Sequence, residues 1–414
     1  MTIRPAKNHV APEQARKCIL DAHLNTFMSV VSELGYSPAT MEMQRALLKD
    51  FLKWTQENDT NIYDLDRTVT DRFLIESGRK SVVRRGDKKT LCRFLDHLRN
   101  EGVILFSAPI LKDTPLTHLK SRYENYLLKE RGLSIRTGPR YWRYIHTFLS
   151  EQFSDNPIQF CEFCPQDIDS FLLRHAHEQR SKAAQLMVSA LRSFLRFLFR
   201  YGETRCDFST AVQTVAAWRL AEVPKYIKSG EIEFLLENCD RTTAVGRRDY
   251  AILLLIARLG LRAGEIVSLE LDDINWRTAE ITIRGKGQFC DRLPLPQSVG
   301  ETLAVYLKND RPNCSTRRVF IRNSAPHRGF KGPSAVSVIV RRAVERSGLD
   351  TPSKGANLLR HSLATGMLRE GASMAEIAEL LRHRSQTSSE IYAKVDIEGL
   401  RSIARVWPEI GGAI

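Results

Sequence analysis

Helical periodicity dominates the first half of the chain. Up to about residue 220, apolar side chains recur at the spacing of helices with one buried face. The pattern breaks at Pro224, because proline lacks an amide hydrogen and disfavours helix in the residue before it. We therefore predict that residues 1 to 220 are almost wholly helical and that residues 222–225 form a linker.

This helical half contains a weak internal repeat with an offset of about 97 residues. The repeat predicts two successive four-helix units, although amphipathic helices can also resemble one another by chance. Each copy has a Gly-x-Ser-x-x-Thr start, in which Ser or Thr can cap free helix amides. The matched positions are Gly35, Ser37 and Thr40 with Gly132, Ser134 and Thr137; His23-Leu24 with His118-Leu119; Phe51-Leu52 with Phe148-Leu149; Phe73-Leu74 with Phe171-Leu172; and Phe94-Leu95 with Phe194-Leu195.

The second half mixes helices with a small sheet. Ser229 is expected to cap a helix, and the apolar run from Asp249 to Leu259 predicts a buried one. Residues 279–284 alternate apolar and polar, and after Gly285-Lys286-Gly287 a second short strand at 292–295 completes a β-hairpin. Further helices are predicted at about 297–309, 334–347, 358–370, 374–381 and 387–393. The predicted fold class is mainly α, ending in a mixed α/β domain.

Charge points to a polyanionic partner. The 414 residues carry a net charge of +14, and 43% of them are apolar, which is enough to build two or three cores. Two segments concentrate the cations, at 79–93 and 311–331, although each could also be a solvated loop. The first segment supplies our candidate DNA-binding residues Arg79, Lys80, Arg84, Arg85, Lys88 and Lys89.

Metal and membrane signals are weak. Cys161 and Cys164 form a single Cys-x-x-Cys with no second pair at zinc-finger spacing, so we expect no metal or other cofactor. The sequence shows no signal peptide and no apolar run long enough to span a bilayer. We therefore expect a cytoplasmic protein with no membrane partner.

Five residues in separate short motifs suit chemistry on a phosphodiester: Arg262, Lys286, Arg360, His383 and Tyr392. Arginine keeps its charge and offers a planar fork that matches two phosphate oxygens. A tyrosine hydroxyl can attack phosphorus and form a covalent intermediate. Taken singly, each of these residues could instead be a surface or packing residue.

In this order and spacing the motifs resemble the tyrosine recombinases, also called the phage integrase family. The arginine boxes are Gly-Leu-Arg-x-Gly-Glu at 260–265 and Leu-Leu-Arg-His-Ser at 358–362, and Tyr392 follows His383 by nine residues. The resemblance covers about residues 113 to 398 and is most specific from 250 to 395. It implies that Arg262 and Arg360 hold the phosphate, that His383 positions it, that Lys286 protonates the leaving 5′ oxygen, and that Tyr392 is the nucleophile.

The chain departs from the family at residue 357, where histidine is most common and Asn357 stands here. An amide can donate to a phosphate oxygen but cannot accept the proton of Tyr392. Asn357 is therefore either a catalytic donor or a cap of the helix that bears Arg360. Arg382 stands where a glycine is common and would add a cation, and His361 is expected to pack behind the site.

The resemblance also implies an architecture. We expect a helical N-terminal DNA-binding module at 1–108, a SAM-like core-binding domain at 113–220 and a catalytic domain at 226–414, together forming a C-shaped DNA clamp. In the core-binding domain the aromatic residues Tyr141, Trp142, Tyr144 and Phe148 are expected to form the core. Arg136, Arg140 and Arg143 would then remain available for phosphate.

The function expected from the resemblance is site-specific recombination of double-stranded DNA through a 3′-phosphotyrosine intermediate. The enzyme would act without metal as a homotetramer, with or without a companion recombinase, to integrate, excise or transpose a mobile element. The alternatives are a type IB topoisomerase-like enzyme and a catalytically silent DNA-binding regulator. The sequence does not reveal the target site, the host or the direction of exchange.

Overall fold

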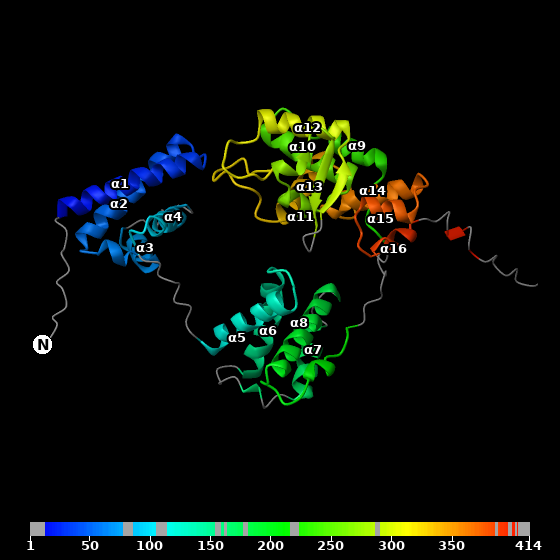
Figure 1. Ribbon diagram of the computed structural model, residues 1–414, viewed down its shortest axis with the longest axis horizontal. Coiled ribbons are helices and arrows are strands. Elements are labelled where there is room, and N and C mark those ends of the chain that lie inside the picture. Colours follow the sequence, from blue (N-terminus) through cyan, green and yellow to red (C-terminus); the bar gives the residue numbers. More distant parts are fainter. Residues whose placement is uncertain are drawn as a thin grey trace, which may run out of the picture. The chain divides into compact units, whose positions relative to one another are not determined.

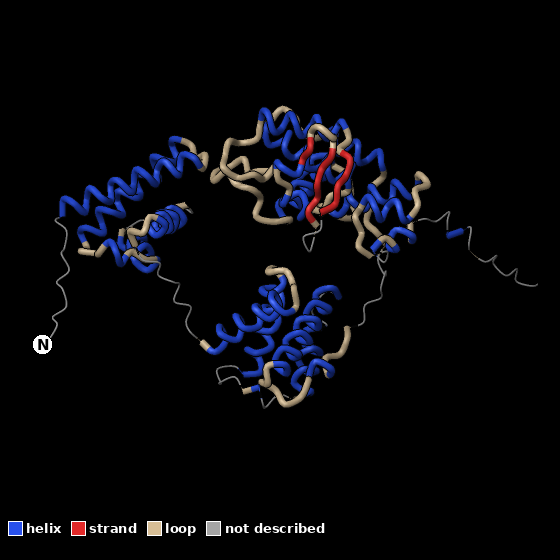
Figure 2. Tube along the Cα trace, in the orientation of Figure 1, coloured by secondary structure: helices blue, strands red, loops and turns tan. Residues whose placement is uncertain are grey.

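A computed structural model describes residues 13–77, 86–104, 114–153, 159–160, 164–176, 181–215, 223–285, 290–385, 388–395, 400–401 and 404. These residues are mostly helical and include one small sheet, which Figure 2 shows in red, so the predicted fold class is confirmed. The chain forms two compact units, residues 1–105 with 222–414 and residues 106–221. The three predicted domain boundaries and the C-shaped clamp stay predictions.

The first helical bundle has a core of its own. Its helices are α1 (Glu13–Glu33), α2 (Pro38–Glu57), α3 (Arg67–Glu76) and α4 (Asp87–Asn100), with the short η1 (Ile62–Asp64) before α3 (Figure 1). As predicted, Ser37 caps α2, where its side chain accepts the amide of Thr40 at 3.3 Å. Gly35 precedes this cap with a φ of 79°, a conformation that favours glycine.

The second bundle has the same order of helices. It contains α5 (Pro115–Asn125), which continues as η3 (Tyr126–Glu130), then α6 (Thr137–Phe153), α7 (Pro165–Ala176), α8 (Ser181–Arg200) and the short η5 (Phe208–Thr210). Trp142, Tyr144 and Phe148 are buried in its core, and Tyr141 packs partly buried against it, as predicted. Gly132, which matches Gly35, also has a positive φ, of 58°.

Equivalent positions of the two copies make equivalent contacts. The matched aromatic-Leu pairs are buried in both bundles. Two edge-on aromatic contacts recur in both bundles. Phe51 on Phe73 in the first (ring centroids 5.2 Å apart, 65° between planes) corresponds to Phe148 on Phe171 in the second (5.1 Å, 69°). Phe27 on Phe94 (5.3 Å, 72°) corresponds to Tyr123 on Phe194 (5.3 Å, 87°). Because both sequence spacing and ring packing repeat, the two bundles are tandem copies of one helical fold.

The last part of the chain surrounds one apolar helix. Its elements are α9 (Ser229–Glu237), α10 (Ala244–Leu259), α11 (Ala263–Ser268), η6 (Leu271–Asp273), β1 (Ile274–Asn275), β2 (Glu280–Arg284), β3 (Cys290–Pro294), α12 (Gln297–Asn309), α13 (Ser334–Ser347), α14 (Asn357–Arg369), α15 (Met374–Leu380) and α16 (Glu390–Ala393). The central residues 251–257 of α10 are all buried, and α10 packs against α9, α12, α13 and α14. A helix that is apolar on every side is stable only when other elements enclose it.

The sheet is antiparallel in the order β1-β2-β3. The predicted hairpin is confirmed, with Arg284 opposite Cys290 at its end and Ile281 and Ile283 buried. The sequence did not reveal β1, because two residues cannot show an alternating pattern. The prediction for Ser229 was wrong by one position: Lys228 is the N-cap, and its amide donates to the Glu231 carboxylate at 2.7 Å.

None of the helices, as far as the structure describes them, is both long enough and apolar enough to cross a bilayer.

If the two bundles are independent copies, loss of a matched ring should loosen only its own core. We expect Phe73→Ala and Phe171→Ala each to destabilise their own bundle by about 3–5 kcal/mol, the usual cost of truncating a buried phenylalanine. Hydrogen exchange of the full chain measures this, with α10 and α14 as the internal reference. Loss of protection in both bundles from either substitution would contradict two separate copies.

Candidate active site

Arg360 is anchored by backbone carbonyls. It lies in the first turn of α14, is only 5% exposed, and donates to the carbonyl of Gly260 and, at 2.6 Å, to that of Leu381. Gly260 ends α10 with a φ of 58°, and a Cβ at this position would lie 2.5 Å from the Leu381 side chain. The glycine of the first arginine box is therefore required for both its backbone conformation and this close approach.

Glu265 joins the first arginine box to the segment before His383. Its side chain is 6% exposed, and its carboxylate accepts the amide of Arg262 at 2.8 Å, the Arg262 guanidinium at 2.7 Å and the Arg382 guanidinium at 2.9 Å. Burial alone would raise the pKa of Glu265, but Arg382 and Arg262 outweigh it and the net pKa is lowered. The carboxylate is therefore ionised at neutral pH, and Arg262 remains 44% exposed at its side chain.

Arg382 is buried, whereas the sequence suggested only an added cation. Its φ is 53°, in the left-handed region that favours glycine, and its side chain is 4% exposed. Besides Glu265 it donates to the carbonyl of Leu380 at 2.9 Å. Burial lowers the pKa of Arg382, and the nearby Glu265 opposes that shift.

Tyr392 lies between two histidines. Its side chain is 1% exposed, and its hydroxyl is 2.9 Å from Nδ1 of His361. The His383 ring is parallel to the phenol, with centroids 6.3 Å apart, and His383 Nδ1 is 2.8 Å from the buried Ser389 hydroxyl. The structure therefore brings together His383 and Tyr392, the two residues that the resemblance to the tyrosine recombinases paired.

The site concentrates positive charge around neutral histidines. Burial and the Arg262 charge lower the pKa of Arg360 to about 10, so this guanidinium stays protonated at neutral pH. Burial, followed by Arg360, Arg262 and Arg382, lowers the pKa of His383 to about 4, so its ring is neutral. Burial raises the pKa of Tyr392, while Arg360 and Arg262 partly oppose that shift. The guanidinium groups of Arg262, Arg360 and Arg382 lie near the Glu265 carboxylate, so positive charge is in excess among these four residues.

Two predicted site residues remain, Asn357 and Lys286. Asn357 is the first residue of α14 and is exposed, and the N-cap is Ala356 without a side-chain cap bond. The structure therefore does not support the capping alternative for Asn357. Lys286 lies outside the described residues, between the ends of β2 and β3.

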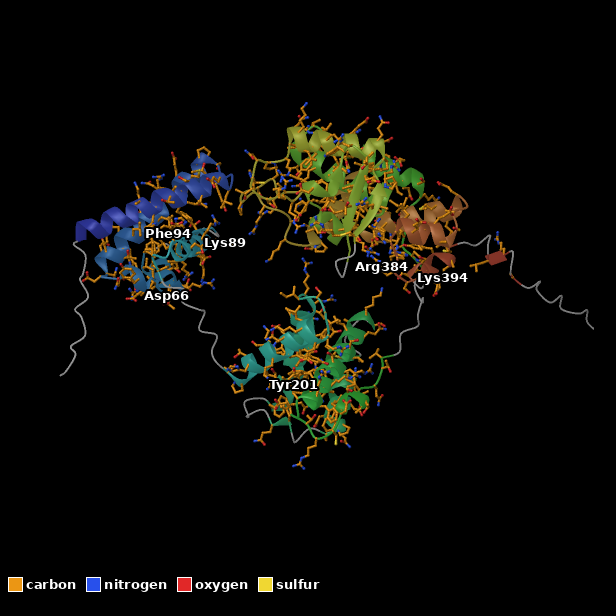
Figure 3. All side chains as sticks on the ribbon, in the orientation of Figure 1. Asp66, Lys89, Phe94, Tyr201, Arg384 and Lys394 are labelled. Atoms are coloured by element: carbon orange, nitrogen blue, oxygen red, sulfur yellow. The ribbon has the colours of Figure 1, made fainter. Side chains whose placement is uncertain are left out.

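The predicted DNA-binding residues differ in how they are engaged. Arg79, Lys80, Arg84 and Arg85 lie outside the described residues. Lys88 pairs with Asp71 at 2.7 Å, whereas Lys89 is exposed on α4, the helix that also carries buried Phe94 (Figure 3).

In the second bundle Arg136, Arg140 and Arg143 are all exposed. Arg143 donates to the Tyr144 hydroxyl at 2.9 Å and lies over the Tyr144 ring. Arg136 and Arg140 have no side-chain hydrogen bond or ion pair among the residues described.

The basic segment at 311–331 is partly neutralised. Arg317 pairs with Asp272, Arg318 pairs with Glu270 at 3.4 Å, and Arg311 donates to the carbonyls of Thr316 and Arg318. The acidic partners lie more than forty residues earlier, so local sequence could not reveal them. No group of three side chains suited to a metal ion occurs in the part of the chain that the structure describes.

Sequence reasoning missed three residues of the cluster. Glu265 was noted only as part of a motif, Arg382 only as an added cation, and His361 as packing behind the site. A signal existed for Glu265, since its motif offered a carboxylate three residues after Arg262 on a short helix. For Arg382 and His361 only the folded structure reveals the partners, which lie 117 and 31 residues away.

Two segments of the chain match protein-family models. Residues 225–398 match the Phage integrase family, and residues 121–202 match the Phage integrase N-terminal SAM-like domain. A protein of Sinorhizobium fredii named as an integrase/recombinase, y4rA, is 37% identical over 385 residues, covering 92% of this chain and 93% of the relative. Tyrosine recombinase XerD of Listeria monocytogenes is 29% identical over 282 residues, covering 66% of this chain and 92% of that protein.

Solved structures share the fold. The XerH site-specific recombinase, in a post-cleavage complex with palindromic difH substrate, aligns with a TM-score of 0.54 and 19% identity over 70% of this chain and 85% of that one. A lambda integrase dimer bound to a COC′ core site aligns with a TM-score of 0.52 and 18% identity over 79% of this chain and 91% of that one.

The buried Glu265–Arg382 pair leads to a stability prediction. Glu265→Gln should cost about 3–5 kcal/mol, because it leaves the Arg382 charge buried without a carboxylate. Arg382→Met should cost less, since Arg262 still pairs with Glu265. Arg382→Gly should be about 1 kcal/mol milder than Arg382→Met, because glycine relieves the left-handed backbone.

Hydrogen exchange of the α10, α11 and α14 amides in the full chain measures these differences. Arg384→Met is the matched control: Arg384 lies two residues away and forms an exposed pair with Asp291 at 3.6 Å, for which a loss below about 1 kcal/mol is expected (Figure 3). If Glu265→Gln and Arg384→Met lower the free energy of unfolding by the same amount, the buried Glu265–Arg382 pair does not stabilise the fold more than an exposed pair does.

Proposed function

Since the chain belongs to the phage integrase family and is a tyrosine-type site-specific recombinase, we propose that Tyr392 cleaves DNA by forming a covalent bond to its 3′ phosphate. The observation that carries this proposal is the position of the Tyr392 hydroxyl, which is buried between His361 and His383 near Arg360 and Arg262. A phenol among fixed cations is suited to attack an anionic phosphodiester, since the cations stabilise the added negative charge.

The proposed reaction conserves the energy of the bond that is broken. The Tyr392 oxygen bonds to phosphorus, the bond from phosphorus to the 5′ oxygen breaks, and Lys286 supplies the proton that this oxygen takes up. Attack by another 5′ hydroxyl reverses these steps and rejoins the strands without ATP. Arg262 and Arg360 occupy the role that a metal ion has in metal-dependent nucleases, so no metal is needed.

Double-stranded DNA is the proposed partner. XerH and lambda integrase, whose fold this chain shares, were solved on DNA substrates. Exchange between two duplexes breaks four strands, and the proposed site holds one Tyr392 per chain, so four copies of the chain would act together. We propose the cytoplasm as the location, because the relatives are bacterial and bacterial DNA lies there.

A mobile-element role is the finer proposal. It rests on y4rA, which covers nearly the whole chain and is named as an integrase/recombinase, and on the additional first bundle. That bundle repeats the packing of the SAM-like domain, so we propose that it adds DNA contacts outside those of the core-binding and catalytic parts.

Tyr392→Phe tests the covalent mechanism. The variant should bind DNA nearly as tightly as the wild type, because only one oxygen is lost, and it should form no covalent complex. The measurement uses a suicide substrate nicked near the cleavage point, with excess chelator, resolved on a denaturing gel. A protein–DNA band that persists in the variant removes Tyr392 from this role, and a wild-type band that requires magnesium contradicts the metal-free mechanism.

The first bundle is tested through the salt dependence of binding. Removing one cation that neutralises a DNA phosphate should flatten the log–log salt slope by about 0.9. We expect this change for Lys89→Ala and a smaller one for Lys88→Ala, because Lys88 already pairs with Asp71. Lys53→Ala, on α2 of the same bundle with its side chain 76% exposed, is the control and should leave the slope unchanged. If all three variants keep the salt slope of the wild type, the proposal that this face of the bundle contacts DNA is wrong, and a protein-binding role becomes the better explanation.

A further inference from the structure

The Tyr392 hydroxyl has a specific partner that the motif pattern did not predict. Its oxygen lies 2.9 Å from Nδ1 of His361, and the two rings are tilted by 57° with centroids 5.7 Å apart. Nδ1 accepts this hydrogen bond when the ring carries its own proton on Nε2. A nucleophile needs such an acceptor, because the phenol must lose its proton as its oxygen bonds to phosphorus.

The other two candidates for this task are placed less well. Asn357 is exposed and lies one helical turn before His361, on the same face of α14, and its amide cannot accept a proton. The Nδ1 atom of His383 is engaged with the Ser389 hydroxyl at 2.8 Å, and its ring is parallel to the phenol at 1°, so it stacks on the ring.

We propose that His361 is a catalytic residue and serves as the general base that takes the Tyr392 proton during cleavage. In the forward step the proton moves from the Tyr392 oxygen to His361 Nδ1, the oxygen bonds to phosphorus, and the 5′ oxygen leaves with a proton from another group. In rejoining, the 5′ hydroxyl returns its proton to that other group as its oxygen bonds to phosphorus. The bond from phosphorus to the Tyr392 oxygen breaks, and His361 returns the proton to the departing phenol oxygen. No proton or electron is gained or lost over the cycle.

The surroundings keep the ring ready for this task. Burial and the adjacent Arg360 charge lower the pKa of His361, so the ring is neutral and can accept a proton at neutral pH. Arg360 also donates to the Gly260 and Leu381 carbonyls, which fixes the turn of α14 that carries His361. The same turn of α14 thus carries both the proposed base and Arg360, which is proposed to hold the phosphate.

His361→Asn and His361→Ala test the inference, which rests on the proposed nucleophilic role of Tyr392. Asparagine can still hydrogen-bond the phenol but cannot take its proton, so it separates positioning from proton transfer. We expect both variants to bind DNA normally and to slow single-turnover cleavage by about 10²-fold, the usual contribution of a general base. Added imidazole should restore at least about tenfold of the rate to the alanine variant, since it can accept the proton.

A substrate with sulfur in place of the 5′ bridging oxygen isolates the nucleophile side. A thiolate leaves without protonation, so loss of the leaving-group acid no longer matters, whereas the defect of His361→Asn should persist. The wild-type protein on the same sulfur substrate gives the reference rate against which the defect of His361→Asn is measured.

Failure of the inference and failure of the nucleophile assignment give different results. If Tyr392→Phe is inactive while His361→Asn cleaves within about threefold of wild type, or regains the wild-type rate on the sulfur substrate, His361 is not the base. If Tyr392→Phe still forms the covalent complex, the nucleophile assignment itself is wrong.

Discussion

The architecture of this site depends on one buried carboxylate. Glu265 accepts the amide and guanidinium of Arg262 and the guanidinium of Arg382, and so joins the end of α10 to the segment that leads to His383. A buried anion is unfavourable unless donors surround it, so this geometry strongly disfavours alternative positions of these arginines. Because Arg382 shares the charge of Glu265, Arg262 is not fully neutralised and retains a half-exposed side chain for an anionic ligand.

Excess positive charge and neutral imidazoles are two results of the same arrangement. Burial lowers the pKa of His383 and of His361, and the arginines that attract a phosphate lower it further: Arg360 acts on both rings, and Arg262 and Arg382 act on His383. A histidine that is neutral beside several cations can accept a proton without competing for the anion. The same burial that keeps these rings neutral raises the pKa of Tyr392, so the phenol is protonated at neutral pH before it reacts.

Local patterns in the sequence predicted what is local in the fold. The helices of the last part, the hairpin and the His383–Tyr392 neighbourhood followed from periodicity and motif spacing. The buried partners of charged residues could not be predicted this way: Arg317 pairs with Asp272, and Arg382 with Glu265, over long separations in sequence. A count of charged residues does not show which of them form ion pairs. It therefore overestimated the number of unpaired cations in residues 311–331. The sequence predicted only that His361 packs behind the site, because its contact with Tyr392 depends on how α16 packs against α14.

The left-handed backbone of Arg382 has an evolutionary consequence. A glycine occupies this conformation without strain, and a single-base change in a glycine codon can produce arginine. Such a change would be selected against unless an acidic partner already lay within reach, since it adds both strain and a buried charge. Glu265, which is fixed by its bond to Arg262, supplies that partner in advance. With arginine at this position, loss of Glu265 would leave a buried guanidinium without a carboxylate, so the two residues are expected to be kept or replaced together.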